Sequence, residues 1–311
     1  MNRKILLVII GAIILCFAGL NNKYPLLTLD SGVYIDSGFT REVPADRSIM
    51  YGIFTAHASW GKSLWLVVFT QALLLSLMLF YYFRYFSRNS RYIVYYLATV
   101  FFITFCMSAS VTVSTIDPGI FGGIALLGIG LLLFARNLKT RDFAIIFLSA
   151  TIGLGMDISY FGMALLVLIV YGIFLIFKRK KARGIETNLK KLSLAFSSML
   201  TGFLLLCLVH FLFGAGFGPV KNINMAMMPA MIHTELVNKY LNNNCYERDL
   251  KLCMYQDSID SILTGTGKIK PSFQKPPVVK EFQTIANEIQ SQNNITRKMI
   301  ANTPGDLSGL L

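Results

Sequence analysis

Carboxylates are the side chains in the apolar part of this chain whose type and placement could support chemistry. Eight acidic residues precede residue 215, namely Asp30, Asp36, Glu42, Asp46, Asp117, Asp142, Asp157 and Glu186. All but Asp142 and Glu186 fall on one side of the topology derived below. Carboxylates gathered at one side of a helix bundle can handle a cation, a proton or a phosphate-bound metal. The alternative is that these loops are simply polar, and we prefer that interpretation for Glu42 and Asp46.

The segment 21–62 mixes acidic, basic and aromatic residues more densely than any other. It carries Asp30, Tyr34, Asp36, Arg47 and Tyr51. The four-residue spacing of Asp30 and Tyr34 puts both side chains on one face of a helix or of a strand. Two alternatives stay open. Asp30 could serve as a helix cap or turn residue, and Arg47 could contact a lipid headgroup.

The second half of this segment has the composition of an interfacial helix. Residues 49–60 are largely apolar and end at Trp60, a residue type that anchors helices at the membrane surface. His57 lies in this stretch, and an exposed interfacial imidazole is the simplest interpretation of it. The chain has 3 His in all, at scattered positions. We therefore infer no zinc site.

The composition determines which elements must position these residues. The chain has 311 residues, of which 54% are hydrophobic and only 14% are charged. Soluble domains carry about 25% charged residues, so a water-soluble enzyme with one ordinary core is excluded. The net charge of +13 is better explained by membrane orientation than by nucleic-acid binding. We expect an all-α polytopic membrane protein whose partner is membrane lipid.

Runs near 20 apolar residues are needed to cross a hydrocarbon core of about 30 Å. Six runs come close to this length, at 5–20, 64–83, 92–110, 119–135, 158–177 and 192–214. A seventh, 143–155, has 13 residues and reaches only roughly 20 Å as a helix. The first run fits an uncleaved anchor better than a signal peptide, because no small-residue cleavage site closes it. We predict about seven crossings, one of them short.

Basic residues alternate between the segments that separate these runs. Four segments hold 15 Lys and Arg in total, whereas the intervening ones up to residue 214 hold only Lys23, Arg41, Arg47 and Lys62. This asymmetry predicts a cytoplasmic N terminus and an exterior C terminus in a bacterial inner membrane. It holds only if the short run 143–155 also crosses, which supports the count of seven.

Two regions follow from this count, a membrane region over 1–214 and an exterior segment over 215–311. The second is rich in Asn, Gln, Lys and Pro and has no spanning run. Cys245 and Cys253 lie in it, on the side of the membrane where disulfides form. We predict a disulfide between them, which in the chain-entropy model contributes roughly 2.5 kcal/mol. The alternative is a pair of buried free thiols.

Several short motifs resemble those of the C-type (GT-C) integral-membrane glycosyltransferases, in which a first crossing leads into a long exterior loop. Asp30 and Tyr34 match an acidic-x-x-x-Tyr pattern, and 46–51 resembles an Arg-Pro-x-x-Tyr stretch. Asp117 with Pro118, and Asp157 after 155–156, resemble later exterior motifs. Ser31 stands where the family often has a second acidic residue, so a divalent metal lacks a clear motif and the cofactor stays open. The family's members are usually longer, so this chain would be a truncated or degenerate member.

The resemblance implies transfer of a sugar from a polyprenyl-phosphate donor to an envelope glycan, lipid or protein acceptor at the outer face. Asp30 would be the catalytic base, and Arg47 would bind the phosphate with its planar guanidinium. The substrate-binding residues would be Tyr34, Asp36, Arg47, Tyr51, His57, Asp117 and Asp157.

Two other functions compete with this one. The first is a non-catalytic protein of envelope polysaccharide assembly or lipid-carrier binding, built on the same scaffold. The second is a transporter, which is less well supported because transporters commonly show internal repeats and paired broken helices. We see no internal repeat, and only 143–155 looks like a broken helix.

Overall fold

The computed structural model describes residues 3–44, 47–87, 91–178 and 185–219. The calls on Asp46 and on Cys245 and Cys253 fall outside these residues, as does almost all of the segment 215–311. Within the described residues the chain is helical, and no β-strand forms. The helices are α1 (Arg3–Leu15), α2 (Phe17–Asn22), α3 (Leu29–Thr40), α4 (Ile49–Ser59), α5 (Leu64–Phe86), α6 (Tyr92–Phe105), α7 (Ala109–Ser114), α8 (Gly119–Phe134), α9 (Thr140–Gly155), α10 (Ser159–Lys178) and α11 (Ile185–Leu212).

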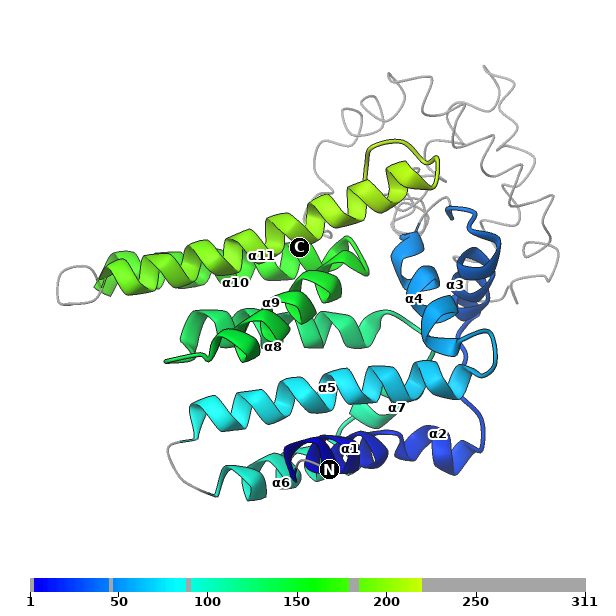
Figure 1. Cartoon of the computed structure of the whole chain (residues 1–311), viewed down its shortest axis with the longest axis horizontal. Helices are drawn as coiled ribbons and strands as arrows, with labels where there is room; N and C mark the ends of the chain where they lie inside the picture. Colours follow the sequence, from blue (N-terminus) through cyan, green and yellow to red (C-terminus); the bar gives the residue numbers. More distant parts are fainter. Residues whose placement is uncertain (1–2, 45–46, 88–90, 179–184, 220–311) are drawn as a thin grey trace, which may run out of the picture. The chain divides into compact units, whose positions relative to one another are not determined.

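The long helices pack side by side as a bundle (Figure 1). Helix α5 contacts α1, α6 and α8, and helix α11 contacts α8, α9 and α10. The core consists of apolar side chains from all of these helices, with Met78, Tyr96 and Ile129 fully buried. Helices α3 and α4 pack on each other at one end of the bundle, where α4 also contacts α5.

Among the residues that the structure describes, three helical segments are long and apolar enough to cross a membrane, Leu64–Phe86, Ser159–Phe177 and Asn188–Leu212. Two more, Tyr92–Phe105 and Gly119–Phe134, are apolar but shorter. The chain is therefore a helical protein with the character of a membrane protein. The seven crossings, the orientation and the bacterial inner membrane stay predictions.

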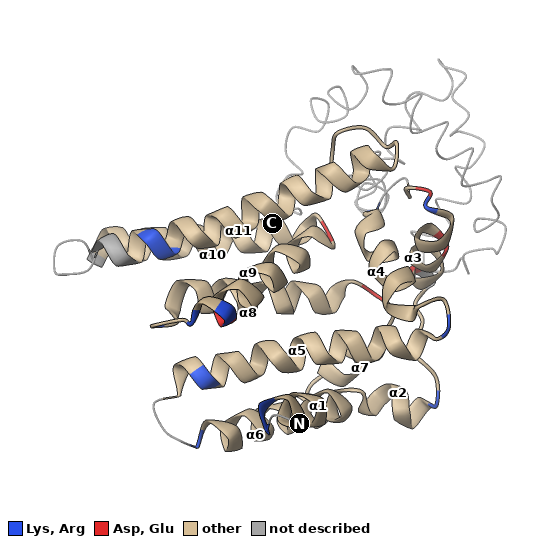
Figure 2. Cartoon of the chain, viewed as in Figure 1, with Lys and Arg blue, Asp and Glu red and all other residues tan. Residues whose placement is uncertain are grey.

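The ends of the bundle differ in charge (Figure 2). The end where α5, α8 and α10 finish carries mostly Lys and Arg, and Asp142 is an exception there. The other end, where α3 and α4 lie, carries most of the acidic residues that the structure describes. This segregation agrees with the alternation of basic residues along the sequence, although it does not assign either end to a side of the membrane.

Two helices that the sequence predicted as continuous are broken. The run 5–20 is interrupted at Cys16, between α1 and α2, and the run 92–110 is interrupted after Phe105, between α6 and α7. A break in an apolar environment frees backbone N–H groups that need acceptors. Ser110 and Ser114 of α7 supply them, because their Oγ atoms accept from the N–H groups of Ala18 at 2.7 Å and Gly19 at 2.9 Å. The two breaks therefore stabilise each other.

Helix α9 begins three residues earlier than the apolar run 143–155 predicted, at Thr140. Its 16 residues span roughly 24 Å. The added turn contains Asp142, which is 7% exposed and accepts hydrogen bonds from Arg84 Nη1 at 2.9 Å and from the Tyr85 hydroxyl at 2.6 Å. Satisfying this carboxylate lets a polar residue extend an otherwise apolar helix.

Helices α3 and α4 approach closely at two glycines. A Cβ added at Gly38 would collide with the backbone carbonyl of Gly52, and one added at Gly52 would lie 2.8 Å from the carbonyl oxygen of Tyr34. Gly32, on the same helix as Gly38, faces open space. Close packing of α3 on α4 therefore requires the absence of a side chain at Gly38 but not at Gly32.

We predict that Gly38→Ala lowers the free energy of unfolding by about 1–3 kcal/mol, because the added methyl forces the two backbones apart. Gly32→Ala is the matched control on the same helix and should be neutral or slightly stabilising, since Ala is the better helix former. Thermal unfolding of the purified protein in detergent measures both. Equal destabilisation by the two variants would contradict the close contact.

Candidate functional site

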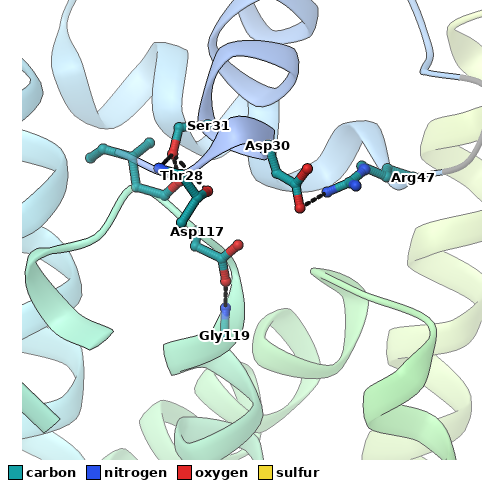
Figure 3. Close-up of polar contacts among 7 residues, drawn as sticks. Thr28, Asp30, Ser31, Arg47, Asp117 and Gly119 are labelled. Atoms are coloured by element: carbon teal, nitrogen blue, oxygen red, sulfur yellow. Dashed lines mark hydrogen bonds and ion pairs between the residues drawn. The ribbon is translucent and has the colours of Figure 1, made fainter. Parts of the chain in front are cut away.

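The start of α3 is tied to the segment that joins α7 to α8. Ser31 Oγ accepts a hydrogen bond from the backbone N–H of Thr28 at 2.8 Å and donates one to the carbonyl oxygen of Ile116 at 2.7 Å (Figure 3). Just before the helix, Leu26 N–H donates to Ser114 O at 2.9 Å and Leu26 O accepts from Ile116 N–H at 2.9 Å. These bonds hold the first turn of α3, which carries Asp30, against the bundle.

Asp30 and Arg47 form an ion pair (Figure 3). Asp30 is the second residue of α3, and Arg47 precedes α4. The side chains are 40% and 28% exposed, respectively. The Arg47 guanidinium also lies 5.7 Å from the centroid of the Tyr34 ring, within range of a cation–π interaction. Three residues that the sequence singled out, Asp30, Tyr34 and Arg47, are thus in contact.

Tyr34 is held in a buried aromatic cluster. It is 3% exposed and packs edge-on against Tyr51, with the ring centroids 5.0 Å apart. Burial raises the pKa of Tyr34 to about 12; Arg47 opposes this rise, whereas the carboxylates of Asp157 and Asp117 add to it. The Tyr34 phenol therefore stays protonated near neutral pH and can donate a hydrogen bond.

Tyr51 lies in the core of the bundle and is not at the exposed surface of the site. It is fully buried, and its hydroxyl donates to Gln71 Oε1 at 2.6 Å. Gln71 Nε2 in turn donates to the carbonyl oxygens of Val113 at 2.9 Å and Thr115 at 3.2 Å. Sequence reasoning missed Gln71, although an amide inside the apolar run 64–83 was a visible signal.

Asp117 and Asp157 bind backbone N–H groups at the starts of two helices. Asp117 Oδ1 accepts from Gly119 N–H at 2.7 Å at the start of α8 (Figure 3). Asp157 Oδ1 accepts from Ser159 N–H at 2.8 Å and from its hydroxyl at 2.7 Å, at the start of α10. Both carboxylates act electrostatically on Tyr34, so they belong to the same end of the bundle as the ion pair.

Asp36 and His57 are exposed. The backbone carbonyl of Asp36 accepts from Thr40 Oγ1 at 2.8 Å, and His57 Nδ1 lies 2.8 Å from Ile53 O, one turn back in its own helix. These local contacts do not link either residue to Asp30 or Arg47. Their assignment to substrate binding stays a prediction.

His210 is a further polar residue at this end that the sequence analysis did not assign to the site. It is fully buried near the end of α11, and the backbone groups of Arg47 and Gly218 approach its ring. Neither ring nitrogen has a partner of good hydrogen-bond geometry within the described residues. We regard it as a packing residue beside Arg47.

The described residues bring no three His, Cys, Asp or Glu side chains together in a way that could hold a metal ion. The cofactor therefore stays open. No family model, no curated protein and no solved structure matches this chain.

We predict that Tyr51→Phe lowers the free energy of unfolding by about 1–3 kcal/mol, because Gln71 Oε1 then remains buried without its donor. Tyr24→Phe is the matched control, since Tyr24 is 71% exposed. Removal of its hydroxyl should change the free energy of unfolding by less than about 0.5 kcal/mol. Chemical denaturation followed by circular dichroism measures the difference. If Tyr51→Phe unfolds at the same denaturant midpoint as the wild type, the hydrogen bond from Tyr51 to Gln71 does not stabilise the fold.

Proposed function

We propose that this protein is a GT-C-type glycosyltransferase that moves a sugar from a polyprenyl-phosphate donor to an acceptor of the bacterial cell envelope. One observation carries the proposal: the packing of α3 on α4 brings Asp30, Tyr34 and Arg47 into contact. This contact lies at the end of the bundle opposite the end that is rich in Lys and Arg. A lipid-linked phosphate at the exterior membrane surface would meet a cation and a carboxylate there, with the Tyr34 ring packed against the cation.

The ion pair gives each partner a role in the reaction. Arg47 offers the planar donor arrangement that binds phosphate oxygens two at a time. A donor phosphate that binds Arg47 competes with Asp30 for the guanidinium and leaves the carboxylate free to act as a base. Because both side chains are partly exposed, the exchange does not require the core to open.

The transfer step is a substitution at the anomeric carbon and needs no oxidant or reductant. The acceptor hydroxyl oxygen forms a bond to the anomeric carbon while Asp30 takes the hydroxyl proton. The bond between the anomeric carbon and the phosphate oxygen breaks, and its electron pair leaves on the polyprenyl phosphate. Arg47 stabilises the charge that develops on this leaving group. The buried Tyr34 ring packs against the Arg47 guanidinium and helps to hold it in place for this role.

A second function, binding of the lipid carrier without catalysis, is favoured by the bonds that the carboxylates already make. Asp30 is paired with Arg47, while Asp117 and Asp157 each accept from backbone N–H groups. Such residues can be retained for structure alone. In this alternative Arg47 still binds the phosphate, but Asp30 moves no proton.

We predict that Asp30→Asn reduces sugar transfer by about 10²–10⁴-fold, the usual contribution of a general base. Asp36→Asn is the matched control, because Asp36 is an exposed carboxylate on the same helix. The measurement uses proteoliposomes supplied with undecaprenyl phosphate that carries a radiolabelled hexose or pentose. Folding should survive, because a partly exposed ion pair contributes only about 0–1 kcal/mol.

Binding of sugar-free undecaprenyl phosphate separates the two functions. Arg47→Ala should weaken it in both cases. Full transfer by Asp30→Asn would exclude Asp30 as the base. Binding that depends on Arg47, without transfer by the wild-type protein from any donor, would establish the non-catalytic function instead.

A further inference from the structure

The end of the bundle opposite Asp30 gathers cations from two segments far apart in the sequence. These are Arg136, Lys139 and Arg141 around the α8–α9 link, and Lys190 and Lys191 on α11. Lys191 Nζ donates to the carbonyl oxygen of Ala135 at 2.6 Å, and α8, α9 and α11 contact one another. The two groups of cations therefore form one basic surface, defined by these five residues (Figure 2).

The carboxylate that follows Arg141 in the sequence does not neutralise this surface. Asp142 is 7% exposed, and its Oδ2 accepts from Arg84 Nη1 and from the Tyr85 hydroxyl. The side chain of Glu186 lies outside the described residues, and even one full negative charge there would leave the five cations in excess. Arg136, Lys139, Arg141 and Lys190 are all exposed. The basic surface thus has the charge to bind an anion of more than one charge.

Exposed apolar side chains border the basic surface directly. Phe134 immediately precedes the link and is 51% exposed, and Leu189 on α11 is also 51% exposed. The apolar part of α11 runs over Asn188–Leu212, so Lys190 and Lys191 lie within its first turn. Lys side chains at such a helix end extend to the level of the lipid headgroups.

We propose that the basic surface binds an anionic phospholipid, with cardiolipin as the best fit because it carries two phosphates. The cations hold the phosphates, and Phe134 and Leu189 contact the acyl chains. A soluble phosphate ion would use the charges but not the apolar border. This inference is independent of the proposed glycosyltransferase function, since it concerns the opposite end of the bundle.

The test uses the full-length protein in mild detergent, titrated with cardiolipin or with neutral phosphatidylcholine, and bound lipid counted by native mass spectrometry. A cation near the membrane surface contributes about fivefold to the affinity for anionic lipid. Arg136→Gln alone should therefore weaken cardiolipin binding about fivefold. The triple variant R136Q/K139Q/R141Q should weaken it on the order of 100-fold.

The matched control is the triple variant K23Q/R41Q/K62Q, which removes three exposed cations from the other end of the bundle. It should bind cardiolipin as the wild type does. An equal loss in this control, equal binding of phosphatidylcholine, or displacement of cardiolipin by millimolar inorganic phosphate would each overturn the proposal. The single variant keeps the test decisive if the triple variant does not fold.

Discussion

The amide of Gln71 must satisfy its hydrogen bonds inside an apolar bundle, and the arrangement of the candidate site depends on how it does so. Its oxygen accepts from Tyr51 of α4, and its nitrogen donates to the backbone around the end of α7. An unpaired amide in such surroundings would cost several kcal/mol. The same side chain therefore fixes α4, which follows Arg47, and the segment that leads to Asp117. Ser31 makes a parallel connection from α3 to Ile116.

The same requirement explains the other irregular features of the bundle. The break between α1 and α2 is tolerated because Ser110 and Ser114 accept the freed N–H groups. Ser76, in the middle of α5, donates to the carbonyl oxygen of Val8 at 2.7 Å and contacts the Tyr96 hydroxyl at 2.7 Å. Small polar side chains in apolar helices thus mark the places where helices are joined, whereas leucine and phenylalanine fill the space between them.

Composition and periodicity predicted much of this architecture. The apolar runs became helices, the helix expected over 49–60 appears as α4, and the four-residue spacing of Asp30 and Tyr34 is helical. Arg47 could not be placed from sequence, because its contact with both residues depends on the chain reversal between α3 and α4. The helix breaks escaped prediction for a different reason. Hydropathy averaged over a window of residues does not reveal single serines. A serine can accept a hydrogen bond from the backbone of another helix only once that helix lies beside it.

The partners of Gln71 come from segments on both sides of α5 in the sequence, so its hydrogen bonds form in the order in which these segments are synthesised. The ribosome releases the chain from its N terminus, so α5 emerges after Tyr51 but before Val113 and Thr115. Gln71 lies about 10 Å along α5 from the start of that helix, and its side chain is fully buried in the finished bundle. Until α7 arrives, its nitrogen lacks the carbonyl acceptors of the finished bundle. Gln71 can therefore complete its hydrogen bonds only after α6 and α7 have packed against α5.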